Sequence, residues 1–287
     1  GDLPQDDAVK AECRARGIAV LHCEMAWFPQ IDTVYFDWDG VNGASSILRA
    51  PLPRLTAGRR RELESFLACY HALMADAPPP PDFPRDFILA PLQVETDSSL
   101  VRYSPVSCMS EFVGMAREVF PGETIVVRRH PKSPSAPASL PPGCVYAGPE
   151  IGLHQLLARS KAVAALNSTV VLEALTYYKP VVAFGRGLFS GRGVVLDASA
   201  AVPAEMRRFA GAPLDAGRRD AIAGLLYELI FNRTFYNRDL GDPVKVGSAR
   251  FYRQMLRLPS RRARSSARVA ARGDEDAGPD HDGRERG

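Results

Sequence analysis

The sequence lacks the short motifs that identify several large enzyme classes directly. It contains no Walker-type phosphate loop, no HExxH pair and no GxSxG element. These absences argue against a P-loop nucleotidase, a zinc protease of the HExxH type and an α/β-hydrolase. The glycines between Gly185 and Gly193 do not fall at GxGxxG spacing, so a nicotinamide dinucleotide site is not predicted either.

Cysteine is also scarce. The five cysteines stand far apart in the chain, at Cys13, Cys23, Cys69, Cys108 and Cys144, and none forms a CxxC pair. An odd number of dispersed thiols indicates neither a disulfide framework nor a zinc site. We therefore expect reduced thiols, no bound metal and a cytoplasmic location.

Long apolar runs are missing as well. None approaches the roughly 20 residues that a membrane-spanning helix needs, and residues 1–17 lack the apolar centre of a signal peptide. The net charge is only +3 and the basic residues are scattered except near the C-terminus, so nucleic-acid binding is not indicated. What the chain does have is 287 residues that are 46% hydrophobic, enough for one large or two modest domains.

Composition divides the chain into three parts. Thr56–Met74 has the apolar spacing of an amphipathic helix, and the proline-rich stretch at 76–84 then suits a semi-rigid connector. The stretch from residue 259 onward has almost no large apolar residues, which is typical of disorder. We predict a partial N-terminal domain over residues 1–82, a Rossmann-like domain over 83–258 and a disordered charged tail over 259–287.

Apolar strand patterns alternate with helical patterns after Arg85. This alternation predicts an α/β fold with a parallel, doubly wound sheet. The stretch Ala162–Gly185 is its most informative unit, because it reads as strand, turn, helix and strand. Asn167, Ser168 and Thr169 would begin the helix at the carboxyl end of a buried strand, where an open α/β sheet binds ligands and where helix N–H groups suit a phosphate. The same residue types are also ordinary helix caps.

Other polar residues are predicted at the same edge of the sheet. Arg128 and His130 end one strand and can donate hydrogen bonds to phosphate, while Glu173 follows about one turn into the helix and could bind ribose hydroxyls. Gln93 ends another strand, and Asp97 follows it as a candidate nucleophile, although Asp-Ser-Ser is also a common helix start. Glu24, which we place in a loop of the first domain, is the other candidate acid or base.

Five segments together resemble the capsule polysaccharide biosynthesis family, which includes bacterial β-Kdo transferases. In order they are EMAWFPQIDTVYFDWDGVNGASS, PLQVETDSS, VVRRHP, LNSTVVLEALTYYKPVVAFG and FNRTFYNRD. The resemblance spans residues 18 to 239. It implies a GT-B glycosyltransferase with two Rossmann-like domains, of which the first is truncated because the family's opening βαβ elements have no counterpart before Asp7.

The resemblance also implies roles for the residues at the sheet edge. Arg128, which stands where the family usually has Lys, would grip the donor together with His130 and with Gln93, Asn167, Ser168 and Thr169. Glu173 would assist at the ribose. Asp97 matches the position expected to attack the anomeric carbon in a retaining reaction, and Glu24 matches an acidic position beside it.

The function implied is transfer of a sugar, Kdo from CMP-Kdo, to a lipid-linked or glycan acceptor. The expected partners are this nucleotide sugar and the acceptor, with no further cofactor. Association with the inner face of the plasma membrane or with capsule assembly machinery stays open. Two alternatives also stay open: a non-catalytic module that binds a nucleotide sugar, and a sugar-nucleotide epimerase of GT-B shape.

Overall fold

The computed structural model of the chain describes residues 3–75, 80–132, 137–242 and 244. Residues Gly1–Gly241 cluster as one compact unit, which contains every element named below. The predicted tail at 259–287 lies outside the described residues, as do residues 76–79 of the proline-rich connector. The boundary predicted in that connector therefore stays a prediction.

A parallel six-stranded sheet forms the centre of the unit. Its strands are β3 (Ile88–Pro91), β4 (Ile125–Arg128), β5 (Cys144–Tyr146), β6 (Ala162–Ala165), β7 (Val181–Ala183) and β8 (Leu196–Asp197). They are ordered β5-β4-β3-β6-β7-β8, and every neighbouring pair is parallel. The order reverses between β3 and β6, and in doubly wound sheets the ligand crevice lies outside the strand ends at this point.

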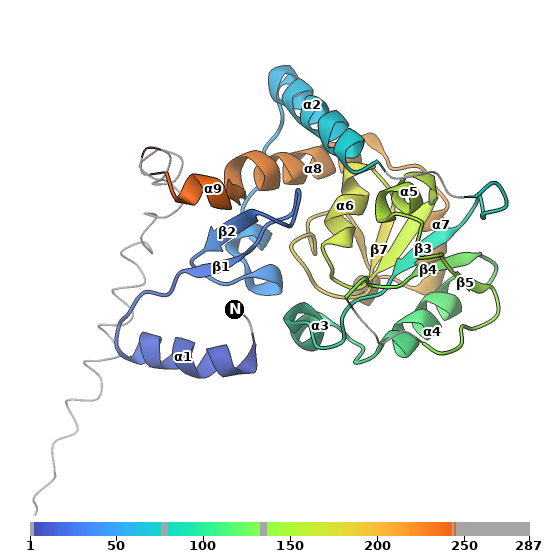
Figure 1. Cartoon of the computed structure of the whole chain (residues 1–287), viewed down its shortest axis with the longest axis horizontal. Helices are drawn as coiled ribbons and strands as arrows, with labels where there is room; N and C mark the ends of the chain where they lie inside the picture. Colours follow the sequence, from blue (N-terminus) through green and yellow to red (C-terminus); the bar gives the residue numbers. More distant parts are fainter. Residues whose placement is uncertain (1–2, 76–79, 133–136, 243, 245–287) are drawn as a thin grey trace, which may run out of the picture. The chain divides into compact units, whose positions relative to one another are not determined.

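Both faces of this sheet are buried because its strands are almost wholly apolar. Side chains alternate between the faces: Leu89, Val126 and Val163 belong to one core cluster, and Ile88, Ile125 and Ala162 belong to the other. Helices cover each face, with α4 on one side and α5 and α6 on the other (Figure 1). The predicted α/β fold with a doubly wound parallel sheet is confirmed.

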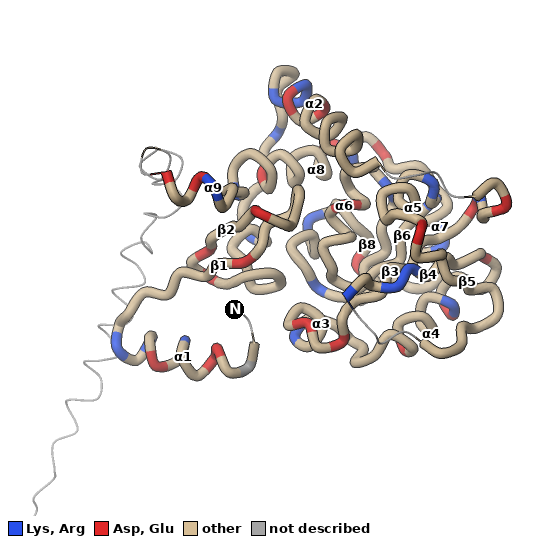
Figure 2. Tube along the Cα trace, viewed as in Figure 1, with Lys and Arg blue, Asp and Glu red and all other residues tan. Residues whose placement is uncertain are grey.

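Helices connect these strands and complete both core clusters. They are α3 (Ser98–Tyr103), α4 (Met109–Val119), α5 (Leu153–Arg159), α6 (Val170–Thr176), α7 (Pro203–Ala210) and α8 (Ala216–Tyr227). After α8 a π-helical segment, η4 (Glu228–Arg233), leads to the short strand β9 (Phe235–Tyr236) and to α9 (Asn237–Leu240). Lys and Arg residues are interspersed with Asp and Glu residues along the trace, which is mostly neither (Figure 2).

The residues before the connector form a smaller layer. It consists of α1 (Pro4–Ala15), the strands β1 (His22–Met25) and β2 (Thr33–Asp37), two short 3-10 turns, η1 (Asn42–Ala44) and η2 (Ser46–Leu48), and the helix α2 (Ala57–Leu73). The strands β1 and β2 pair antiparallel, and β9 adds to β2 from the far end of the chain. Helix α2 packs on α8, with the Arg60 guanidinium bonded to Asp220 and the Tyr227 hydroxyl to Glu62.

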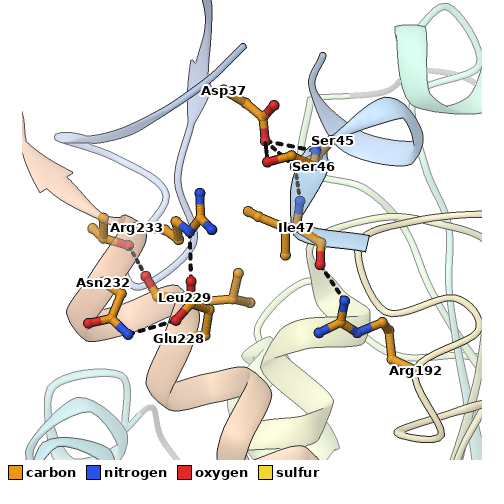
Figure 3. Close-up of polar contacts among 10 residues, drawn as sticks. Asp37, Ser45, Ser46, Ile47, Arg192, Glu228, Leu229, Asn232 and Arg233 are labelled. Atoms are coloured by element: carbon orange, nitrogen blue, oxygen red, sulfur yellow. Dashed lines mark hydrogen bonds and ion pairs between the residues drawn. The ribbon is translucent and has the colours of Figure 1, made fainter. Parts of the chain in front are cut away.

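Polar contacts at the ends of this layer fix its loops (Figure 3). The Asp37 carboxylate is buried and accepts hydrogen bonds from the Ser45 hydroxyl at 2.7 Å and from the Ser46 backbone N–H at 2.9 Å. Arg192, in the loop after β7, donates to the Ile47 carbonyl. Since β7 ends at the carboxyl edge of the parallel sheet, this contact joins the edge to the η2 turn.

Candidate active site

The two strands at the switch point are linked by a reciprocal pair of amides. Gln93, just after β3, donates from Nε2 to Asn167 Oδ1 at 3.1 Å, and the Asn167 backbone N–H donates to Gln93 Oε1 at 3.1 Å. Asn167 also donates from Nδ2 to the Ser99 carbonyl at 2.7 Å. Both side chains are buried. The pair therefore ties the end of β3 to the end of β6 and holds the first turn of α3.

A glycine lets the segment after β7 pass close to this amide pair. A Cβ atom on Gly185 would lie 3.1 Å from Asn167 Nδ2 and 3.1 Å from the Tyr103 carbonyl oxygen, which is tighter than ordinary van der Waals contact. The next residue, Arg186, donates its backbone N–H to the same Tyr103 carbonyl at 2.8 Å. The end of α3 is thus fixed against the end of β7.

Asp97 is the N-cap of α3, and its side chain is exposed. Its Oδ1 atom accepts the Ser99 backbone N–H at 2.8 Å. Asp-Ser-Ser therefore does begin a helix, as its sequence pattern indicated. Asp97 also has an electrostatic effect on a nearby side chain. The Asp97 charge acts on His130, raising the pKa of that imidazole against the larger effects of burial and of Arg128. Asp97 and the strand-end cation thus lie within electrostatic reach of the same side chain.

His130 and Arg128 lie where predicted, at the end of β4. Burial first, and then the Arg128 charge, lower the pKa of His130, so the imidazole is neutral at neutral pH. Its Nδ1 atom accepts the Lys132 backbone N–H at 3.1 Å. A neutral ring that accepts at Nδ1 carries its proton on Nε2. His130 can therefore donate a hydrogen bond to a phosphate without first being protonated.

Glu173 lies in the first turn of α6 and is 14% exposed. Burial raises the pKa of Glu173 to about 7, and the Arg128 charge opposes that rise. Its Oε2 atom is buried and has no hydrogen-bond partner among the described residues. Buried carboxylate oxygens are rarely left unsatisfied, and carboxyl groups with raised pKa values cluster at functional sites.

The start of α6 differs from the prediction in one respect. We expected Asn167, Ser168 and Thr169 to cap the helix, but the helix begins only at Val170 and Thr169 makes no side-chain cap bond. The reason is that Thr169 already has helical backbone angles, whereas a capping residue has extended ones that turn its side chain toward the N–H groups of the two or three residues after it. The Ser168 hydroxyl oxygen is buried without a partner in the described part of the chain.

Glu24 lies within strand β1, and its prediction as a loop residue is wrong. It pairs in register with Tyr35 and is half-buried, and its Oε1 atom accepts the Met25 backbone N–H at 3.0 Å. Exposed apolar neighbours such as Met25 concealed the strand pattern. The contacts described for Glu24 do not connect it with Asp97 or with the strand-end cations.

One residue near the site carries no sequence signal. His154, in α5, is buried, and its Nε2 atom lies 4.0 Å from Glu173 Oε2. A histidine inside an amphipathic helix pattern looks like a core residue, and only the packing of α5 against α6 brings it to Glu173. Two open hollows, of about 390 and 520 Å³, lie elsewhere, beside α7 and beside α3 and α4.

Among the described residues, no group of three or more His, Cys, Asp or Glu side chains is placed to hold a metal ion. None of the helices in the described part of the chain combines the length and the apolar character needed to span a membrane.

Comparison with known proteins shows a likeness to one family. Residues 145–236, which include β6 and α6, match the model described as capsule polysaccharide biosynthesis protein. The chain is also 28% identical over 197 residues to Protein FixF of Sinorhizobium fredii, covering 66% of this chain and 48% of that protein. It thus spans about half the length of the curated relative. The predicted resemblance to the capsule polysaccharide biosynthesis family is confirmed.

Two solved structures share the fold. The β-Kdo 2,4 transferase of Thermosulfurimonas dismutans KpsC matches with a TM-score of 0.61 at 16% identity, over 82% of this chain and 79% of that one. The β-Kdo 2,7 transferase of the same protein matches with a TM-score of 0.57 at 20% identity, over 82% and 83%. The predicted GT-B-like fold is confirmed by these likenesses.

Proposed function

We propose that the protein is a glycosyltransferase of capsular or related surface polysaccharide synthesis. It would transfer Kdo from CMP-Kdo to a glycan or glycolipid acceptor. The match of residues 145–236 to the capsule polysaccharide biosynthesis model carries the proposal. The shared fold with two β-Kdo transferases supports it.

The donor would bind at the switch point. Arg128 and the Nε2–H of His130 would donate to the donor phosphate, and the unpartnered Ser168 hydroxyl would donate beside them with Thr169. The Glu173 carboxylate would accept hydrogen bonds from the ribose hydroxyls. Gln93 and Asn167, whose amides bond to each other, would contact the nucleotide beside these groups.

The proposed chemistry is a double displacement at the anomeric carbon. A carboxylate oxygen of Asp97 would attack this carbon while its bond to the phosphate oxygen breaks, and the electron pair would leave with the nucleotide. An acceptor hydroxyl would then attack the same carbon and release Asp97, giving retention. The proton of that hydroxyl would pass to a base, for which Glu24 is the candidate.

Nucleotide binding tests the donor assignment. We expect CMP, at a hundredfold excess over its Kd, to raise the Tm by about 5–10 °C, because a ligand that binds only the folded state stabilises it by mass action. Cytidine, which lacks the phosphate, should give a much smaller shift. Differential scanning fluorimetry measures both. If neither CMP nor CMP-Kdo moves the Tm, the donor assignment fails.

Product analysis separates the alternatives. Incubation with CMP-Kdo and a supplied glycolipid acceptor should give a Kdo-bearing product, which mass spectrometry detects. Binding of CMP without transfer to any acceptor would favour a non-catalytic module. Conversion of the nucleotide sugar without an acceptor would favour an epimerase.

Glu173→Gln should stabilise the protein while it weakens nucleotide binding. The unfolded carboxyl ionises near 4.5 and the folded one near 7, so above pH 4.5 ionisation favours the unfolded chain, and stability falls as pH rises to about 7. At pH 8 this costs about 3 kcal/mol, which the amide removes. Urea unfolding should show the variant more stable at pH 8 and nearly unchanged at pH 5. Lower stability at both pH values would contradict the assignment.

A further inference from the structure

A buried histidine joins two side chains of the helix that carries Glu173. His154 Nδ1 lies 3.0 Å from the Tyr177 hydroxyl, and His154 Nε2 lies 4.0 Å from Glu173 Oε2. Glu173 lies in α6 and Tyr177, four residues later, is the C-cap of that helix, while His154 reaches both from α5. The imidazole thus lies between the hydroxyl and the carboxyl, with one ring nitrogen facing each.

Helix α2 closes the other side of this cluster. The Tyr70 ring packs edge-on against His154 at 5.5 Å between centroids, and His71 stacks on Tyr177 at 3.9 Å. Tyr70 is also close enough for the Glu173 charge to raise its pKa after the larger effect of burial. Among the described residues, the titratable or charged groups with a contact or a charge effect involving Glu173 are therefore Tyr70 from α2, His154 from α5 and Arg128 from β4.

We propose that His154 is a positioning residue that holds the Glu173 side chain ready to accept hydrogen bonds from the sugar hydroxyls of the nucleotide. The inference rests on the proposed function, which makes Glu173 a ligand-binding group. Tyr177 has a defined part in it. When its hydroxyl donates to His154 Nδ1, the neutral ring must carry its proton on Nε2, the nitrogen that faces Glu173. The Tyr177 hydroxyl then donates to His154 Nδ1, and the His154 Nε2–H points toward the Glu173 carboxylate.

Packing alone does not account for an imidazole at this position. The edge-on contact with Tyr70 requires only a flat ring, which phenylalanine would also provide. Phenylalanine or leucine would in addition avoid burying two polar ring nitrogens. Glu173 provides the compensating partner, since its Oε2 atom has no hydrogen bond within the described residues. A shift of less than about 1 Å would turn the 4.0 Å approach into a charge-assisted hydrogen bond.

Titration of Glu173 in the ligand-free protein tests this role directly. The Glu173 carboxyl signal, identified in ¹³C NMR spectra by its loss in Glu173→Gln, should titrate near pH 7 in the wild type. His154→Leu removes the Nε2–H donor, so the midpoint should rise by about one pH unit. His154→Gln, whose amide keeps an N–H in this place, should stay close to the wild type. Tyr177→Phe should raise the midpoint by less.

His71→Gln is the matched control. His71 stacks on the same Tyr177 ring and contacts Thr176, but it does not face Glu173, so its replacement should leave the midpoint unchanged. An unchanged midpoint in His154→Leu overturns the inference. Equal shifts in His154→Leu and His154→Gln overturn it too, because they would show that packing alone matters.

CMP affinity across pH 6–9 separates this inference from the proposed function. In the wild type, CMP binding should strengthen as Glu173 ionises, and in His154→Leu the same rise should occur about one pH unit higher, a tenfold loss of affinity at the intermediate pH. If the wild type does not bind CMP while the NMR midpoints shift as expected, the proposed function fails and the positioning of Glu173 stands. If CMP binds with the same pH profile in both proteins, the inference fails and the proposed function stands.

Discussion

Asp97→Asn should abolish sugar transfer and leave nucleotide binding almost intact. The change replaces a carboxylate oxygen, which can attack the anomeric carbon, with an amide that cannot. Removing the nucleophile of a covalent mechanism lowers kcat by about 10⁴-fold or more. Asparagine and aspartate are equally good N-caps, so the bond to the Ser99 N–H and the start of α3 should persist. Transfer assays and CMP titration measure the two effects separately.

Asp215→Asn provides the matched control. Asp215 caps α8 through a bond of the same kind, from the Arg218 backbone N–H to Oδ1 at 2.8 Å, and it is not among the predicted site residues. Its variant should transfer sugar at the wild-type rate. If Asp97→Asn keeps more than about a tenth of the activity, Asp97 does not act as the nucleophile.

Asp37→Ala should lower the free energy of unfolding by about 3–5 kcal/mol. The buried Asp37 carboxylate accepts two hydroxyl donors and the backbone N–H groups of Asp39, Gly40 and Ser46. Hydroxyls can rotate toward other acceptors, but the three backbone N–H groups cannot, and each donor left unsatisfied away from water costs about 1–3 kcal/mol. Urea unfolding, followed by tryptophan fluorescence, measures the loss.

Ser46→Ala shows whether this loss is specific to the carboxylate. It removes one of the hydroxyl donors to Asp37 and leaves the N–H groups bonded, so it should cost only about 1 kcal/mol. Loss of the Asp37 carboxylate should also disturb the candidate active site, because the η1 turn that follows Asp37 packs against Tyr103 at the end of α3. An Asp37→Ala cost below that of Ser46→Ala would contradict the structural role given to this carboxylate.

Local patterns were sufficient to predict a parallel sheet of strands that alternate with helices, and polar residues at the ends of some of these strands. Arg128 and His130 could be placed because a buried apolar run stops directly before them. The pairing of Gln93 with Asn167 could not be predicted, because it requires β6 to lie beside β3, and strand order is a property of the whole sheet. Helix α3 has six residues, too few to give a clear helical period.

The approach of His154 to Glu173 could not be predicted from sequence patterns, for a related reason. Each residue sits in a helix of seven residues, and their approach depends on how two short helices pack over the same face of the sheet. The Glu24 error arose differently. Strand β1 has Cys23 and Met25 exposed and only His22 buried, so its alternation runs against the usual order of apolar inside and polar outside.

The short strand β9 brings the chain back to the antiparallel sheet that β1 and β2 form. Residues Phe235–Tyr236 complete the sheet begun by Thr33–Asp37, and the Asn237 backbone N–H donates to the Asp32 carbonyl at 2.9 Å. The polypeptide thus leaves the first layer, builds the parallel sheet and comes back to finish the layer it left. A single protease cut in the proline-rich connector would consequently yield two fragments that stay noncovalently associated, in the manner of a split protein.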